Sequence, residues 1–150
     1  MTGIPFTPHH WTLSVSSADA SAAFYAAFGF RTALTWAAED GSLTISHLAR
    51  DDGFILELFE YAANRGRGPA SLEPGNDLEL RGVKHMAFRV PDLAETARAF
   101  RQMDCGMTTE IQHGRTGISY FFIADPDGNW VEIVQDDRTL DTTQLPEPQS

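Results

Sequence analysis

The chain has 150 residues, 42% of them apolar, which suits one soluble globular domain with a core of ordinary size. Its formal net charge of −10 argues against nucleic-acid or anionic-membrane partners, because both require clustered Lys and Arg. There is neither an apolar run of roughly 20 residues nor a signal-peptide pattern, which predicts a cytoplasmic protein that acts on a small molecule. Cys105 is the only cysteine, so any metal would be held by nitrogen and oxygen.

The first module is predicted over residues 9–60 as a strand, a helix and three further strands. Residues 10–15 alternate in polarity, which indicates a half-buried strand with His10 on the face away from the core. A helix over 20–28 follows N-capping residues and ends at Gly29. Three strands separated by Asp-Gly turns complete the module, at residues 31–37, 42–48 and 54–59.

The second module, over residues 82–135, is predicted to repeat this order. Its first strand, 85–90, places His85 and Arg89 on one face. Asp92 is the expected N-cap of a helix. The apolar stripe of that helix is predicted to consist of Leu93, Ala97 and Phe100. The remaining strands are expected at residues 107–111, 118–123 and 129–135.

Two polar segments flank the second module. Residues 61–81 are rich in Gly, Pro, Asn and charge, and they are predicted to form a linker that packs as a flap. Residues 136–150 are acidic and polar, and they are predicted to be a disordered tail.

The two modules are related by an internal repeat of 75 residues. His10 corresponds to His85 and Glu57 to Glu132, and in each module the His and the Glu lie 47 residues apart. An Asp-Gly turn precedes the strand that carries each Glu. Identities between the modules are few, but these positions recur together, and an internal repeat fixes the architecture before any local assignment.

The repeat predicts an α+β fold. Two βαβββ modules would join edge to edge into a curved mixed sheet, with the helices outside and a concave inner face. A pseudo-twofold axis would bring two imidazoles and two carboxylates together in the concavity, which suits a divalent transition metal such as Ni²⁺, Co²⁺, Zn²⁺, Mn²⁺ or Fe²⁺. The predicted metal ligands are His10, Glu57, His85 and Glu132.

Four motifs resemble the vicinal oxygen chelate superfamily, which includes glyoxalase I, methylmalonyl-CoA epimerase, extradiol dioxygenases and antibiotic-resistance proteins. They are His-x-x-Leu-x-Val, Leu-Glu-Leu-Phe-Glu-Tyr, Gly-x-x-His-x-Ala-Phe-x-Val and Asp-Pro-Asp-Gly-Asn-x-x-Glu, within residues 9–135. The resemblance implies a paired βαβββ fold, and its ligand set is most similar to the glyoxalase I and epimerase branch.

What the resemblance implies about function is a metal-dependent lyase or isomerase of a small oxygenated substrate, acting through a metal-stabilised enediolate or enolate. Glu132 is the first candidate for the catalytic base and Glu57 the second. The linker lacks the arginine and asparagine pattern expected of a glutathione site. Two alternatives stay open, an Fe(II)-dependent ring-cleaving dioxygenase and a metal-free antibiotic-binding protein.

Further residues are candidates for contact with the substrate. Trp130 shares a strand face with Glu132, aromatic residues stand on the neighbouring strand, and Arg89 shares the face of His85; aromatic core packing and a position at the rim are the competing interpretations. These candidates are Trp130, Phe122, Tyr120 and Arg89. His9, His47 and His113 are expected to be ordinary polar or surface residues. Exposed sheet edges favour a homodimer.

Overall fold

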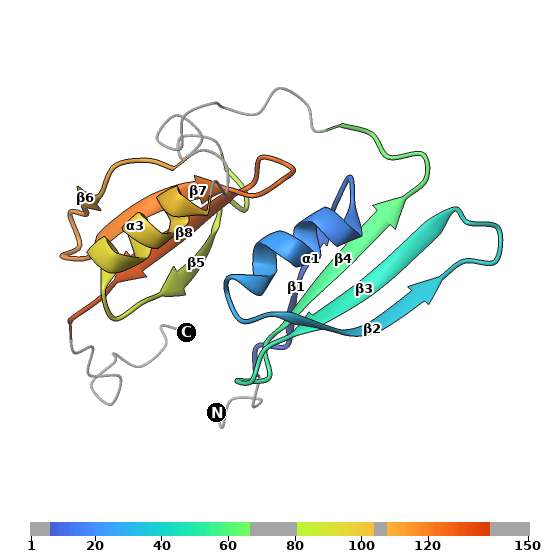
Figure 1. The fold of residues 1–150 in the computed structure, drawn as a ribbon, viewed down its shortest axis with the longest axis horizontal. Helices are drawn as coiled ribbons and strands as arrows, with labels where there is room; N and C mark the ends of the chain where they lie inside the picture. Colours follow the sequence, from blue (N-terminus) through green and yellow to red (C-terminus); the bar gives the residue numbers. More distant parts are fainter. Residues whose placement is uncertain (1–6, 67–80, 104–107, 139–150) are drawn as a thin grey trace, which may run out of the picture. The chain divides into compact units, whose positions relative to one another are not determined.

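The structure is a computed structural model that describes residues 7–66, 81–103 and 108–138 (Figure 1). The chain divides into two compact units. The first contains Met1–Glu79 together with the turn Asp125–Asn129, and the second contains Leu80–Ala124 and Trp130–Ser150. Each unit has its own four-stranded sheet.

The first unit has the predicted β-α-β-β-β order. In its sheet the strands lie in the order β1-β4-β3-β2, with β1 parallel to β4 and the other neighbours antiparallel. The elements are β1 (His10–Ser14), α1 (Ala18–Ala26), β2 (Arg31–Ala37), β3 (Leu43–Ala49) and β4 (Ile55–Tyr61).

The second unit repeats this topology, which confirms the α+β fold of two βαβββ modules. The strand order is β5-β8-β7-β6, and β5 is parallel to β8. The elements are β5 (Met86–Arg89), α3 (Leu93–Gln102), β6 (Gln112–His113), β7 (Ser119–Ala124) and β8 (Trp130–Gln135).

Both helices begin where the sequence provides a capping side chain. The Ser17 hydroxyl accepts a hydrogen bond from the Ala20 amide, and the Asp92 carboxylate accepts one from the Glu95 amide at 2.8 Å. Gly29, with φ of +82°, turns the chain out of α1 into β2. Helix α1 begins two residues before the predicted start because Ser17 is the cap.

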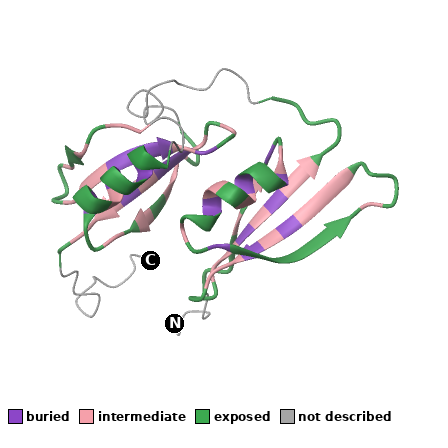
Figure 2. Cartoon of the chain, viewed as in Figure 1, coloured by how far each residue is buried: buried purple, intermediate pink, exposed green. Residues whose placement is uncertain are grey.

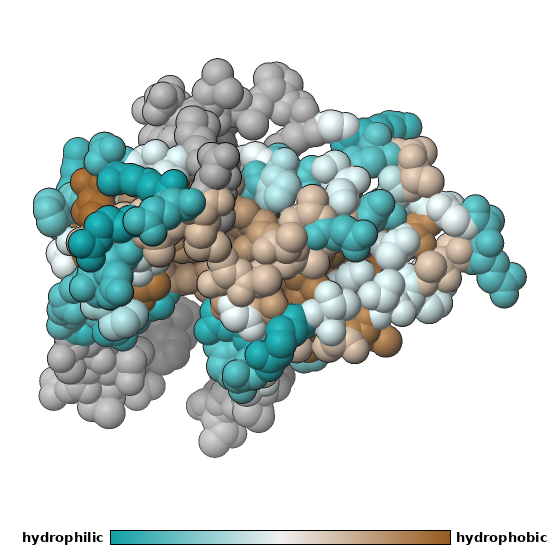
Figure 3. Space-filling model, viewed as in Figure 1, coloured by the Kyte–Doolittle hydropathy of each residue, from teal (hydrophilic) through white to brown (hydrophobic). Residues whose placement is uncertain are grey.

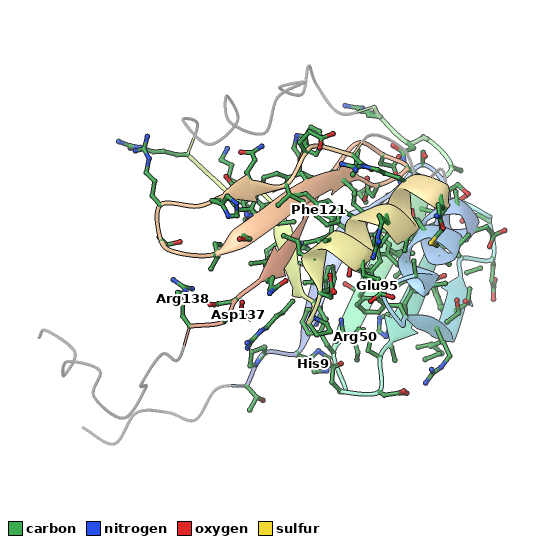
Figure 4. All side chains as sticks on the ribbon, turned by 60° about the vertical axis from the view of Figure 1, so that its left-hand side comes forward. His9, Arg50, Glu95, Phe121, Asp137 and Arg138 are labelled. Atoms are coloured by element: carbon green, nitrogen blue, oxygen red, sulfur yellow. The ribbon has the colours of Figure 1, made fainter. Side chains whose placement is uncertain are left out.

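The apolar core of each unit lies between its helix and one face of its sheet (Figure 2). Leu56 and Leu58 are buried on β4, whereas Glu57 between them lies on the other face. In the second unit Phe121 lies beneath α3, with its ring centroid 6.5 Å from that of Phe100 (Figure 4). The predicted stripe of Leu93, Ala97 and Phe100 is buried, as expected.

The strand predicted at residues 107–111 is wrong in position. Met107 lies outside the described residues, Thr108 makes only an isolated bridge to Ile123, and the strand forms later as β6. The reason is that a side chain takes part in the hydrogen bonds between the backbones of this segment and β7. Thr109 donates its amide to the Phe122 carbonyl, while its hydroxyl accepts the Phe122 amide at 2.9 Å. A hydroxyl in place of a backbone carbonyl interrupts regular pairing.

The two polar segments also differ from expectation where they are described. Strand β4 continues through Tyr61, and the Ala62 amide donates to Ser42, so the linker begins later than predicted. At the tail, Arg138 bonds the Asp136 carboxylate and the Thr116 carbonyl, which holds residues 136–138 against the sheet end (Figure 4). The rest of the linker (67–80), Cys105 and the tail from residue 139 lie outside the described residues.

The helices α1 and α3 have 9 and 10 residues, and no described helix is long and apolar enough to cross a membrane. Hydrophilic side chains cover α3 and the turn between β2 and β3 on the face shown in Figure 3.

The turn Asp125–Asn129 is held by one buried aspartate. The Asp125 carboxylate accepts hydrogen bonds from the amides of Asp127 and Asn129, and from the buried Tyr25 hydroxyl of α1 at 2.9 Å. Burial, and then the Asp125 charge, raises the pKa of Tyr25 well above its ordinary value, so the phenol keeps its proton and donates. The turn before β8 is therefore fixed by side-chain chemistry.

We predict that Tyr25→Phe lowers the free energy of unfolding by about 1–3 kcal/mol, because a buried carboxylate loses a donor. Chemical denaturation followed by circular dichroism measures the change. Tyr61→Phe is the matched control: Tyr61 is 47% exposed, and its hydroxyl should contribute about 0.5 kcal/mol or less. Equal stabilities for the two variants would contradict the proposed role of the Tyr25 bond.

Candidate functional site

Glu57 is the centre of a polar cluster on the open face of the first sheet. Strand register places it directly opposite Thr12 on β1 and His47 on β3. The Thr12 hydroxyl donates to Oε2 of Glu57 at 2.8 Å, and Nε2 of His47 lies 3.0 Å from Oε1. Nε2 of His10 is 3.8 Å from Oε2. Both carboxylate oxygens thus have a side-chain partner.

These contacts favour the ionised form of Glu57. The hydrogen bond from Thr12 lowers the pKa of this carboxyl and partial burial raises it. The contacts with His47 and His10 lower the pKa further. The Glu57 side chain is 19% exposed, so water reaches it. The result is a carboxylate that is charged, accessible and held in one orientation.

The second sheet carries the corresponding pair. Glu132 lies on β8 opposite Ala87 and Phe122, and Nε2 of His85 is 3.4 Å from its Oε2. The side chain of Glu132 is 13% exposed. His85 was predicted to begin this strand but immediately precedes β5, and it still lies beside Glu132.

Aromatic side chains surround this pair. The ring of His85 packs edge-on against Phe122 at 5.1 Å, and Phe122 in turn contacts Tyr120 at 5.6 Å and Trp130 at 6.0 Å. Phe122 and Trp130 are buried, while Tyr120 is partly exposed and donates to Gln112. The three predicted aromatic residues therefore share the sheet face of Glu132 and form an apolar wall next to it.

Arg89 occupies the far end of the same face. Its guanidinium donates to the backbone carbonyl of Asp136. A cavity of about 480 Å³ at this strand end is lined by Arg89, Val90, Pro91 and Asp137. The structure thus places Arg89 at the rim, where one backbone contact already orients it, and contact with a substrate stays a prediction.

The family assignment follows from comparison with known proteins. Residues 7–133 match the family model described as the Glyoxalase/Bleomycin resistance protein/Dioxygenase superfamily. The chain belongs to this superfamily. The resemblance drawn from the four sequence motifs is therefore confirmed.

Individual relatives agree with that membership. A lactoylglutathione lyase of Pseudomonas aeruginosa is 40% identical over 55 residues, which is 37% of this chain and 30% of that protein. One from Pseudomonas putida is 30% identical over 81 residues, 54% of this chain and 46% of that protein. The chain thus spans less than half the length of these two curated relatives. A glyoxalase family protein of Enterococcus faecalis superposes with a TM-score of 0.68 and 25% identity, over 85% of this chain and 96% of that one.

The four predicted metal ligands of this glyoxalase-like chain come as two His–Glu pairs, one in each unit. Within the described part of the chain, no group of three or more His, Cys, Asp or Glu side chains is arranged to hold a metal ion. Each pair nevertheless offers one imidazole and one carboxylate on the open face of a sheet. Donors of this mixed kind fit a divalent transition metal.

Sequence reasoning missed two members of the Glu57 cluster. His47 was expected to be an ordinary polar residue, but it contacts the carboxylate of Glu57. Thr12 lies on the same strand face as His10, and no role was predicted for it. Antiparallel pairing of the predicted strands 42–48 and 54–59 would have identified His47, since the register sets it opposite Glu57. His9 is exposed, and its Nδ1 lies 2.8 Å from Nδ1 of His10.

The apolar wall depends on the bond between Thr109 and Phe122. We predict that Thr109→Val destabilises the protein by about 1–3 kcal/mol, because the amide of the buried Phe122 loses its acceptor. Thr109→Ser keeps the hydroxyl and should lose less than half as much. Denaturant titration compares the three proteins, and equal losses in Val and Ser would show that the hydroxyl is unimportant.

Proposed function

We propose that this protein is a divalent-metal-dependent lyase or isomerase that removes a proton next to a carbonyl of a small oxygenated substrate. The observation that carries the proposal is the repeated pair, His10 with Glu57 and His85 with Glu132, on equivalent strands of two modules of a glyoxalase superfamily chain. Two lactoylglutathione lyases among its relatives support the same class of reaction.

The proposed metal ligands are His10, Glu57, His85 and Glu132. A bound divalent metal would supply Lewis-acid polarisation of the substrate oxygens. The identity of the metal, a homodimer and a cytoplasmic location stay predictions from the sequence.

Glu132 is the proposed general base. It carries a carboxylate on the open face of its sheet and lies beside His85, so it can accept a proton from a carbon acid held over that face. Phe122 and Trp130 limit the access of water on one side.

The apolar wall beside Glu132 also favours a substrate that carries an apolar group. Tyr120 is partly exposed next to Phe122, so a flat or branched carbon skeleton could pack there while its oxygens face the carboxylates. The same surface is the observation that favours the second candidate function, a metal-free protein that binds an aromatic antibiotic. Metal content separates the two functions.

We predict that the purified, untagged protein contains about one equivalent of a divalent transition metal, measured by elemental mass spectrometry. His10→Ala should lose most of it, because one nitrogen ligand is removed. His113→Ala is the control, since His113 is exposed on β6 and lies within hydrogen-bond distance of the Ser119 hydroxyl, at 2.8 Å, and its loss should leave the content unchanged. A wild-type protein that neither contains nor binds Ni²⁺, Co²⁺, Zn²⁺ or Fe²⁺ would favour the binding function.

We further predict that the metal-loaded protein exchanges the α-protons of hydroxyacetone for deuterium in D₂O. Glu132→Gln should slow this exchange by about 10²–10⁴-fold, because the base is removed while a side chain of the same shape is retained. Proton NMR follows the loss of the α-proton signal. Undiminished exchange in Glu132→Gln would exclude Glu132 as the base.

A further inference from the structure

The internal repeat provides a comparison between the two glutamates. The residue opposite Glu57 on the parallel strand is Thr12, and its repeat counterpart opposite Glu132 is Ala87. On the antiparallel side Glu57 faces His47, and Glu132 faces Phe122. The backbone register around the two glutamates is the same in both units, so their neighbours on the adjacent strands differ in side chain alone.

That difference changes how each carboxylate is held. Thr12 and His47 contact separate oxygens of Glu57, at 2.8 and 3.0 Å, which fixes both the position and the rotation of the group. Neither Ala87 nor Phe122 has a hydrogen-bonding side chain. Among the described residues, the carboxylate of Glu132 is approached by one polar side chain, His85, at 3.4 Å.

We propose that Thr12 and His47 are positioning residues that hold Glu57 as a permanent metal ligand, and that their replacement by Ala87 and Phe122 leaves Glu132 free to move as the base. The inference rests on the proposed function, because it assigns different roles to the two glutamates of that site. It assigns to two further residues a role that acts through Glu57.

The physical reason is that the two tasks need opposite constraints. A metal ligand binds more tightly when hydrogen bonds orient it in advance, and removal of such partners typically weakens metal binding by about 10–100-fold. A base must instead approach a carbon, take its proton and later return it, which requires a side chain with few fixed partners. Glu57 has close partners on both oxygens, whereas Glu132 has the His85 contact at 3.4 Å, and this difference matches the two tasks.

The contacts are also poorly explained by stability. The side chains of His10 and His47 are 43% and 32% exposed, and ion pairs open to water contribute about 0–1 kcal/mol. Thr12 is exposed as well. A network of this kind on the open face of a sheet gains little for the fold, so its value lies in the orientation of Glu57.

The test uses Co²⁺ as the probe with the 150-residue chain, and it measures the dissociation constant by chelator competition together with the visible absorption spectrum. We expect Thr12→Val combined with His47→Phe to weaken Co²⁺ binding by about 10–100-fold and to change the spectrum. Thr12→Ser alone keeps the hydroxyl and should bind within about threefold of wild type. Ser14→Ala is the matched control, because Ser14 is the next residue on that face but pairs with Phe59.

The reciprocal variant tests the other half of the inference. Ala87→Thr places a hydroxyl opposite Glu132 on an exposed strand position. Restraint of the base should slow deuterium exchange by about tenfold, and Co²⁺ binding should not become weaker. A general loss of structure would move both quantities, and circular dichroism of each variant reports the fold directly.

Each outcome decides a separate question. A wild-type protein that binds no Co²⁺ overturns the proposed function, and this inference with it. The wild type could bind Co²⁺ through His10 while a folded Thr12→Val, His47→Phe variant keeps the same affinity and spectrum. That result would overturn the positioning role alone. Weakened binding in the double variant, rescued by Thr12→Ser in place of Thr12→Val, supports it.

Discussion

The parallel pairing of the first and last strand in each module is the constraint on which the candidate site depends. It aligns β1 with β4 and β5 with β8, and so brings residues 47 positions apart in the sequence into contact range. A parallel pair needs a long crossover connection, which the helix and two further strands supply. His10 and Glu57, and likewise His85 and Glu132, are neighbours because of this topology.

Successive side chains of a strand point to opposite faces of the sheet, so the core residues and the candidate site residues lie on different faces. The helix of each unit covers one face of its sheet and buries residues such as Leu56, Leu58, Phe121 and Ile133. Glu57 lies between Leu56 and Leu58, and Glu132 directly precedes Ile133, so both glutamates must lie on the other face of their sheets. Substitutions on the open face can alter the chemistry with little effect on the core, because adjacent residues of one strand belong to different environments.

Much of the fold could be predicted from the sequence, because it depends on local signals. Ser17 and Asp92 cap helices by their own hydrogen bonds, and the alternation of residues 10–15 indicates which face of the strand is buried. The repeat identified both His–Glu pairs. These features need only the chain itself and the periods of helix and strand.

Other features depend on contacts that local patterns do not contain. Strand β6 is displaced because the Thr109 hydroxyl, in place of a backbone carbonyl of its own segment, accepts the Phe122 amide of β7, and apolar periodicity carries no sign of that substitution. The role of His47 depends on register: a shift of one residue would turn its side chain to the opposite face. Without the pairing of β3 with β4, a histidine in a strand is indistinguishable from an ordinary polar residue.

The comparison of the two modules bears on the choice between catalysis and simple binding. A protein that only sequesters a ligand gains nothing from different treatment of two equivalent carboxylates, since neither would transfer a proton. Here the repeat preserves the histidines and glutamates but changes their immediate neighbours, from Thr12 and His47 to Ala87 and Phe122. One glutamate is thus oriented by hydrogen bonds and the other stands against an apolar wall. Separate environments for two like groups are a common way to give them separate roles in acid–base chemistry, and this asymmetry therefore favours an enzyme.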